Sequence, residues 1–181
     1  LLVAAGLAPA YSQRPFDAPE MSVVRAGVTR VLAAYDPFPC LAVDGGWNIL
    51  AANPGTAVLL EGVAAHLLHQ PNALRIALHP DGLAPRIANL AQWRGHLLDR
   101  LRREVQESGG ADALLAEIEA YPGGSAPTAL GGVAVPLELD TFEGGRLTFL
   151  SVVTTFGTAL DLTAAELSIE AFLPADDATA A

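Results

Sequence analysis

Residues 40–60 read CLAVDGGWNILAANPGTAVLL, and this stretch decides the fold that we expect. Two short apolar runs, CLAV and NILAAN, flank the glycine pair Gly45–Gly46. Glycine reaches the positive φ angles that a tight primed turn demands, so the pattern predicts a β-hairpin. Asn53–Pro54 then ends the second strand, and a short helix is expected directly after it.

A helix over 18–34 is predicted before this hairpin. Asp17 and Glu20 have the spacing of a capping box, and Pro19 falls in the first turn. Apolar residues recur at helical spacing, which predicts an amphipathic helix. They are Met21, Val24, Val28, Val31 and Leu32.

A longer helix is predicted after the hairpin, over 83–107, with Asp81 or Gly82 as its cap. A shorter helix is expected through 113–121. Strands follow over 133–140 and 146–156, where β-branched residues are frequent. Pro136 fits an edge strand best, because proline cannot donate a ladder hydrogen bond.

A second capping box, formed by Thr163 and Glu166, predicts a last helix through AELSIEAF, residues 165–172. The order of helix, two strands, helices, two or three strands and helix indicates an α+β domain with helices against one antiparallel sheet. A strand, a glycine turn, a strand ending in AAN and then helices is also how PAS-type sensor domains begin.

Composition excludes several function classes. The chain has 181 residues, enough for one domain, and its 51% hydrophobic residues against 17% charged can fill a core. All ten basic residues are arginine and the net charge is -10, so these residues should repel a nucleic-acid backbone. No apolar run approaches the ~20 residues of a membrane span.

The chain has a single cysteine, Cys40, which excludes an internal disulfide and agrees with a cytoplasmic location. We expect Cys40 to be a small buried hydrophobic residue.

No catalytic or metal motif is found. The sequence contains no G-x-S-x-G motif, no Walker loop and no G-x-G-x-x-G motif. We therefore expect that the domain is not an enzyme and binds no cofactor. His66 and His69 are three residues apart, but no nearby acidic residue or third histidine completes a ligand set. We therefore interpret them as two solvated helix histidines and expect no metal.

One arginine suggests a ligand site. Arg94 falls inside the apolar arc of the 83–107 helix, where an unpaired guanidinium would be costly. Either it forms an ion pair with an acidic residue of this chain, or it binds a carboxylate-bearing ligand at the mouth of an apolar cavity. In the second case Trp93 and Phe149 would form walls, with Arg86 and His79 as further cations near the helix start. His79 could instead hydrogen-bond within the turn, and Trp93 could be ordinary core.

Four segments resemble one known family. They are AGLAPAYS (5–12), VDGGWNILAANPGTAVLL (43–60), ALHPDGLAPRIANLAQWRGHLLDRLRR (77–103) and VVTTFGTALDLTAAELSIEAFLPAD (152–176). Together they resemble the MmyB-like ligand-binding domain of bacterial transcription regulators, which follows a helix-turn-helix of the XRE type.

The resemblance implies a PAS-like fold, a hydrophobic effector such as a fatty acid, and DNA binding only through the upstream module. It divides the chain into a linker over 1–16, a PAS-like domain over 17–175 and a tail over 176–181. It does not define the effector contacts, so the site expected here remains the physical one.

Two further expectations concern assembly. Repressor-type modules bind twofold half-sites, which predicts a homodimer through the 18–34 helix or the outer sheet face. The alternative function is a PAS-like dimerisation or interaction module whose cavity is filled by its own side chains.

Overall fold

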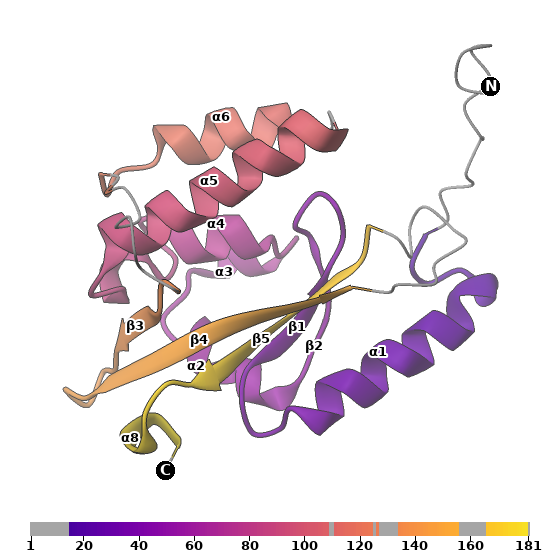
Figure 1. The fold of residues 1–181 in the computed structure, drawn as a ribbon, viewed down its shortest axis with the longest axis horizontal. Helices are drawn as coiled ribbons and strands as arrows, with labels where there is room; N and C mark the ends of the chain where they lie inside the picture. Colours follow the sequence, from indigo (N-terminus) through magenta and orange to yellow (C-terminus); the bar gives the residue numbers. More distant parts are fainter. Residues whose placement is uncertain (1–14, 109–110, 125, 127–133, 156–165, 181) are drawn as a thin grey trace.

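Five antiparallel strands form one sheet in the order β2-β1-β5-β4-β3 (Figure 1). In this computed structural model, residues 15–108, 111–124, 126, 134–155 and 166–180 are described. The strands are β1 (Cys40–Val43), β2 (Ile49–Ala52), β3 (Leu137–Asp140), β4 (Arg146–Thr155) and β5 (Ser168–Pro174). Most of the predicted 1–16 linker lies outside the described residues. The class is the predicted one, α+β with helices packed against one antiparallel sheet.

The predicted β-hairpin is confirmed, but the geometry of its turn differs from the expected one. β1 pairs with β2 through Leu41 and Ala52. The positive φ belongs to Trp47, at 65°, and not to the glycine pair. Asp44 explains the difference, because its Oδ1 accepts hydrogen bonds from the amides of Gly46 and Asn48, each at 2.9 Å. The Asp44 carboxylate thereby stabilises the backbone conformation of the turn.

One helix covers one face of the sheet. α1 (Ser22–Ala34), preceded by a 3-10 turn over Pro19–Met21, lies along one side of the sheet (Figure 1). Its Val28 and Leu32 belong to one buried apolar cluster with side chains of β1 and β5. The predicted helix is therefore confirmed with a later start. Its predicted capping box is not, since Ala18 precedes the 3-10 turn and no side chain caps either segment.

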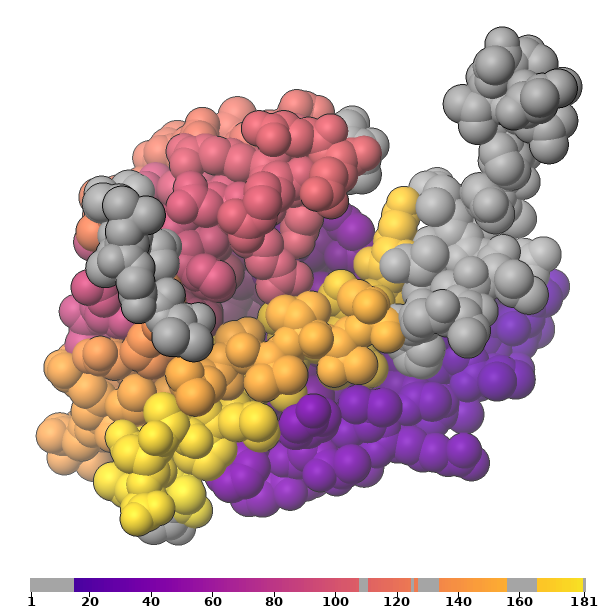
Figure 2. All heavy atoms as spheres, viewed as in Figure 1, coloured from indigo at the N-terminus to yellow at the C-terminus, as the bar shows by residue number. Residues whose placement is uncertain are grey.

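The other face carries the remaining helical layer (Figure 1). It contains α2 (Ala57–Leu60), α3 (Ala65–Leu68), α4 (Ala73–Leu78), α5 (Leu90–Ser108) and α6 (Asp112–Ala120). In space-filling view, the α5–α6 layer, strands β4 and β5, and α1 form three successive bands (Figure 2). Asn72 ties this layer to the hairpin, because its amide donates to the Gly46 carbonyl at 2.8 Å while its oxygen caps α4.

The predicted helix over 83–107 begins seven residues late, at Leu90. Residues Ala84–Arg86 form a 3-10 turn instead. Ile87 then bridges to Leu139, and the Ala88 amide donates to the Glu138 carbonyl at 2.9 Å, so pairing with β3 draws this segment out of the helix. Asp81 is not the cap of this segment, because Leu83 precedes the 3-10 turn and no side chain caps it.

The predicted helix over 165–172 is wrong. Residues Ser168–Pro174 form β5, which lies between β1 and β4 at the centre of the sheet. Ile169 packs on the α1 side and Phe172 on the other, so both faces of the strand are covered and tertiary pairing overrides a local helical pattern. Thr163 of the proposed cap lies outside the described residues. A short helix, α8 (Asp177–Ala180), follows the strand.

The other predicted strands are present. β4 spans most of the expected run, and β3 is shorter than expected, beginning directly after Pro136 on an edge of the sheet. Among the described residues, no helix combines the length and apolarity that crossing a bilayer needs.

Candidate functional site

A cavity of about 60 Å³ lies between the sheet and the helical layer, and we call it the interlayer cavity. Most of its lining is apolar and comes from both layers. The apolar residues include Leu41, Trp47, Ile49, Leu74, Ile76, Leu83, Trp93, Leu97, Leu137 and Phe172. Both tryptophans of the chain are thus in its wall.

An ion pair forms part of the cavity lining. Arg100 of α5 and Glu170 of β5 both line it, and Nη2 of the arginine lies 2.6 Å from Oε1 of the glutamate. The Glu170 residue is only 4% exposed, so this ion pair is largely removed from water. Ser151 of β4 donates a further hydrogen bond to Glu170 Oε2 at 3.3 Å.

Arg100 has a second carboxylate partner. Its Nε donates to Glu104 Oε1 at 2.9 Å, while its guanidinium lies 4.4 Å from the Trp47 ring centroid. The indole of Trp47 donates to the other oxygen of Glu104 at 2.7 Å. Burial lowers the pKa of Arg100, but hydrogen bonding and the charges of Glu170 and Glu104 together raise it above its ordinary value. Arg100 therefore stays protonated, and its positive charge is balanced by the carboxylates of Glu104 and Glu170.

His96 stands one helical turn before Arg100 and also lines the cavity. Burial, and then the positive charges of Arg100 and Arg103, lower the pKa of His96. The imidazole is therefore neutral near pH 7, and it offers one hydrogen-bond donor and one acceptor. Its ring is 5.7 Å from that of Trp93.

Cys40 is fully buried in β1, as predicted. Burial, assisted by the negative charge of Glu170, raises the pKa of its thiol to about 11. A thiol that stays protonated is a poor nucleophile, so Cys40 contributes packing and no covalent chemistry.

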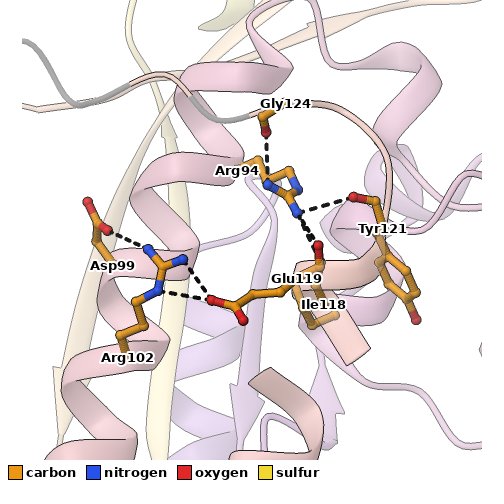
Figure 3. A network of polar contacts seen from close by, with 7 residues as sticks. All are labelled: Arg94, Asp99, Arg102, Ile118, Glu119, Tyr121 and Gly124. Atoms are coloured by element: carbon orange, nitrogen blue, oxygen red, sulfur yellow. Dashed lines mark hydrogen bonds and ion pairs between the residues drawn. The ribbon is translucent and has the colours of Figure 1, made fainter. Parts of the chain in front are cut away.

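Arg94 takes neither of the two roles that the sequence left open (Figure 3). Its guanidinium turns to the carboxyl end of α6. There Nη2 donates to the carbonyls of Ile118, Glu119 and Tyr121 at 3.0–3.2 Å, and Nη1 donates to that of Gly124 at 2.9 Å. The last carbonyls of a helix lack intrahelical donors and carry partial negative charge, so a buried cation is stable there. Arg94 serves as the C-terminal cap of a neighbouring helix.

Arg86 is also used internally. It donates to the carbonyls of Asp140 at 3.0 Å and Glu61 at 2.8 Å, and its guanidinium lies 4.7 Å from the Phe142 ring centroid. It therefore joins the end of α2 to the end of β3 and does not line the interlayer cavity.

The remaining predicted residues divide between cavity, core and surface. Trp93 lines the cavity. Phe149 is 3% exposed and belongs to the same apolar core, without being among the lining residues. Nδ1 of His79 accepts a hydrogen bond from the Asp81 amide at 2.9 Å, which matches the turn-locking alternative.

The expectation that no third histidine or acidic residue approaches His66 is wrong. His79 and Asp81 lie beside it, and one ligand atom from each of the three residues lies within 4.8 Å of the others. His69 is not part of this group. Fold topology, and not sequence spacing, brings the three together.

Sequence reasoning missed the charged residues of the cavity lining, although signals for them were present. Arg100 and Glu104 continue the helix face of Trp93 and Leu97 at spacings of three and four. Glu170 interrupts an apolar run, which marks an unusual charge in a buried strand. The helical pattern of this run hides that signal.

Comparison with known proteins gave one family match and several similar structures. The family model of the MmyB-like transcription regulator ligand binding domain matches residues 24–181. A search of curated proteins gave no match.

The chain is similar to a LOV protein of Rhodobacter sphaeroides, with 11% identity, a TM-score of 0.41, and coverage of 84% of this chain and 69% of that one. It is similar to a domain of a sensory box sensor histidine kinase/response regulator from Geobacter sulfurreducens, with 12% identity, a TM-score of 0.36, and coverage of 88% and 99%. It is also similar to the PAS domain of an HTR-like protein from Haloarcula marismortui, with 8% identity, a TM-score of 0.35, and coverage of 86% and 97%.

Proposed function

Because the chain belongs to the family of MmyB-like transcription regulator ligand-binding domains, we propose that it senses a hydrophobic small molecule in the interlayer cavity. The effector class that we propose is a fatty acid, whose binding controls the attachment to DNA of an XRE-type helix-turn-helix domain upstream. The domain binds its effector and does not transform it. One observation carries the proposal: apolar side chains of two layers line a cavity whose lining also contains the Arg100–Glu170 ion pair.

The size of the cavity requires that binding moves side chains. Its volume of about 60 Å³ is well below the ~150 Å³ of a cavity that holds benzene. Ligand pockets for larger molecules measure about 300–1,000 Å³. A C14 to C18 chain must therefore part the sheet from α5, and this separation is the movement that an upstream domain would sense.

The head group meets a particular arrangement of charges. Arg86 and Arg94 donate to backbone carbonyls, and among the arginines that the structure describes, Arg100 is the one that lines the cavity. It already faces two carboxylates, Glu104 and Glu170. A fatty-acid carboxylate therefore binds Arg100 by replacing Glu170. The negative charge of Glu170 then lies close to the negative charge of the ligand and opposes binding.

This exchange predicts opposite effects for the two partners. Arg100→Met removes a charge-assisted bond and should weaken C16 fatty-acid binding about 10- to 100-fold. Glu170→Gln removes the competing charge and should strengthen binding. A C16 fatty alcohol serves as the control ligand, because it fills the same space without charge and should respond weakly to both changes.

Intrinsic fluorescence measures these affinities directly, since both tryptophans line the cavity. Arg100→Met alone leaves Glu170 buried without its partner, which is destabilising. The double variant Arg100→Met/Glu170→Gln restores neutrality and keeps the affinity comparison valid if the single variant unfolds. Failure of every acid and alcohol from C12 to C18 to change the fluorescence, together with no lipid in native mass spectra, would refute the proposal.

The small cavity also supports the second candidate function, a PAS-like interaction module without a ligand. For either function we propose a cytoplasmic homodimer.

Exposed apolar side chains mark the surface that we propose for the dimer contact. Val23 of α1 is 81% exposed, and Leu150 and Val152 of β4 are each 39% exposed. Strand alternation from the buried Phe149 places both β4 residues on the α1 side of the sheet. Light scattering at high micromolar concentration should give the mass of a dimer, and a monomer would contradict this expectation.

A further inference from the structure

Two histidines and a carboxylate meet where α3 approaches the turn that follows α4. His66 belongs to α3, His79 ends α4, and Asp81 lies in the turn. Nε2 of His66 and Nδ1 of His79 each lie 3.9 Å from the same carboxylate oxygen, Oδ2 of Asp81. None of the three lines the interlayer cavity. The cluster is therefore a feature separate from the proposed effector site.

The turn that carries the cluster is fixed by its backbone. The Ala64 amide donates to the Asp81 carbonyl at 2.9 Å, which joins the turn to the start of α3. The Gly82 amide donates to the His79 carbonyl at 2.9 Å. A Cβ at Gly82 would lie 2.2 Å from the Ile76 carbonyl oxygen, so the turn packs too closely for any other residue. The backbone positions of His79 and Asp81, and of the start of the helix that carries His66, are thus fixed relative to one another.

The His79 ring is held in a form that suits a metal. The Asp81 amide donates to its Nδ1 at 2.9 Å, which requires an unprotonated nitrogen with a lone pair. Tyr121 meets the ring edge-on at 5.0 Å and limits its rotation. A metal ion bound at Nδ1 would use the same lone pair, and its bond to the nitrogen would replace the hydrogen bond from the Asp81 amide. His66 meets the same ring edge-on at 5.5 Å.

We propose that His66, His79 and Asp81 bind one divalent transition-metal ion. Two imidazoles and one carboxylate suit Zn²⁺, Ni²⁺ or Cu²⁺, whereas Mg²⁺ and Ca²⁺ prefer sets made of oxygen alone. Tetrahedral ligands at about 2.0–2.1 Å from zinc stand roughly 3.3 Å apart. The ligand atoms here are 3.9 Å from Asp81 Oδ2 and all within 4.8 Å of one another, so side-chain movements of about 1–2 Å bring them to that spacing. The exposed side chains of His66 and Asp81, at 58% and 60%, can make them. The fourth position stays open for water or another group.

Calorimetry with Zn²⁺ on the untagged, chelator-treated chain tests this site. We expect one ion per chain. His66→Ala and Asp81→Asn should each weaken binding at least about tenfold, because the loss of a ligand costs no less than the loss of a supporting partner. His69→Ala is the matched control, since His69 is an exposed histidine three residues from His66 and outside the cluster.

Three results would overturn the proposal. They are no heat of zinc binding to the parent chain, full binding by His66→Ala, and equal weakening by His69→Ala and His66→Ala, which would place the ion between those two histidines. Circular dichroism and the melting temperature without zinc establish that each variant is folded. His66→Ala keeps the test valid even if Asp81→Asn disturbs the turn, because the His66 side chain is mostly exposed.

Discussion

Replacing Arg94 by Met separates a structural role from a ligand-binding role. Arg94 is 6% exposed, and it donates to four backbone carbonyls at the end of α6 (Figure 3). Methionine keeps most of the apolar stem but cannot donate. The carbonyls of Ile118, Glu119, Tyr121 and Gly124 then lose their shared partner.

The size of the effect follows from the burial of these acceptors. A hydrogen bond that involves a charged group contributes about 1.5–3 kcal/mol, but the four bonds share one guanidinium and are not additive. Only the Ile118 contact is fully buried, so water can reach the other three carbonyls. We therefore expect Arg94→Met to lower the free energy of unfolding by about 3–5 kcal/mol. For a domain of this size, that corresponds to a melting temperature lower by about 6–20 °C.

A neighbouring arginine provides the control. Arg102 lies on the same two-helix interface and pairs with Glu119 Oε1 at 2.7 Å and Asp99 Oδ1 at 3.2 Å (Figure 3). Its side chain is 44% exposed, and exposed ion pairs contribute only about 0.2–1 kcal/mol, so Arg102→Met should change stability little.

Urea denaturation followed by circular dichroism measures both variants, and C16 fatty-acid affinity is measured in parallel. The reasoning predicts a large loss of stability for Arg94→Met with unchanged affinity. If Arg94→Met instead keeps the parent's stability and loses affinity, Arg94 belongs to the effector site and the capping role assigned to it is wrong.

Three other expectations follow from the structure. The Cys40 thiol, whose pKa burial raises to about 11, should react with a thiol reagent at pH 8 only as fast as the domain unfolds, and rapid labelling of the folded protein would contradict this. Burial lowers the pKa of His96, so the stability that its neutral form contributes is complete above the unfolded pKa of 6.5 and is lost as pH falls towards the folded value; His96→Asn should flatten the stability curve between pH 7.5 and 5, and an unchanged slope would show that other groups cause it. With a net charge of -10 and no lysine, residues 1–181 alone should not retard duplex DNA in a gel at moderate salt, and salt-sensitive retardation would contradict the separation from an upstream DNA-binding module.

The sequence determined the features that depend on neighbouring residues. The hairpin around Gly45–Gly46, the amphipathic helix that became α1, the β-branched strand β4 and the burial of Cys40 all follow from patterns within about twenty residues. The family resemblance also lies in short segments, and the family model confirms it over residues 24–181.

Tertiary structure decided everything that depends on which distant residues meet. Whether AELSIEAF becomes helix or strand was settled by the two strands that flank β5. The partner of Arg94 is a helix end, whose carbonyls carry no signature in the sequence. The same holds for Arg100 with Glu170 and for His66 with His79 and Asp81, because strand register and helix placement set these distances. A local pattern reports which face of an element is apolar, but it contains no information about what that face will be packed against.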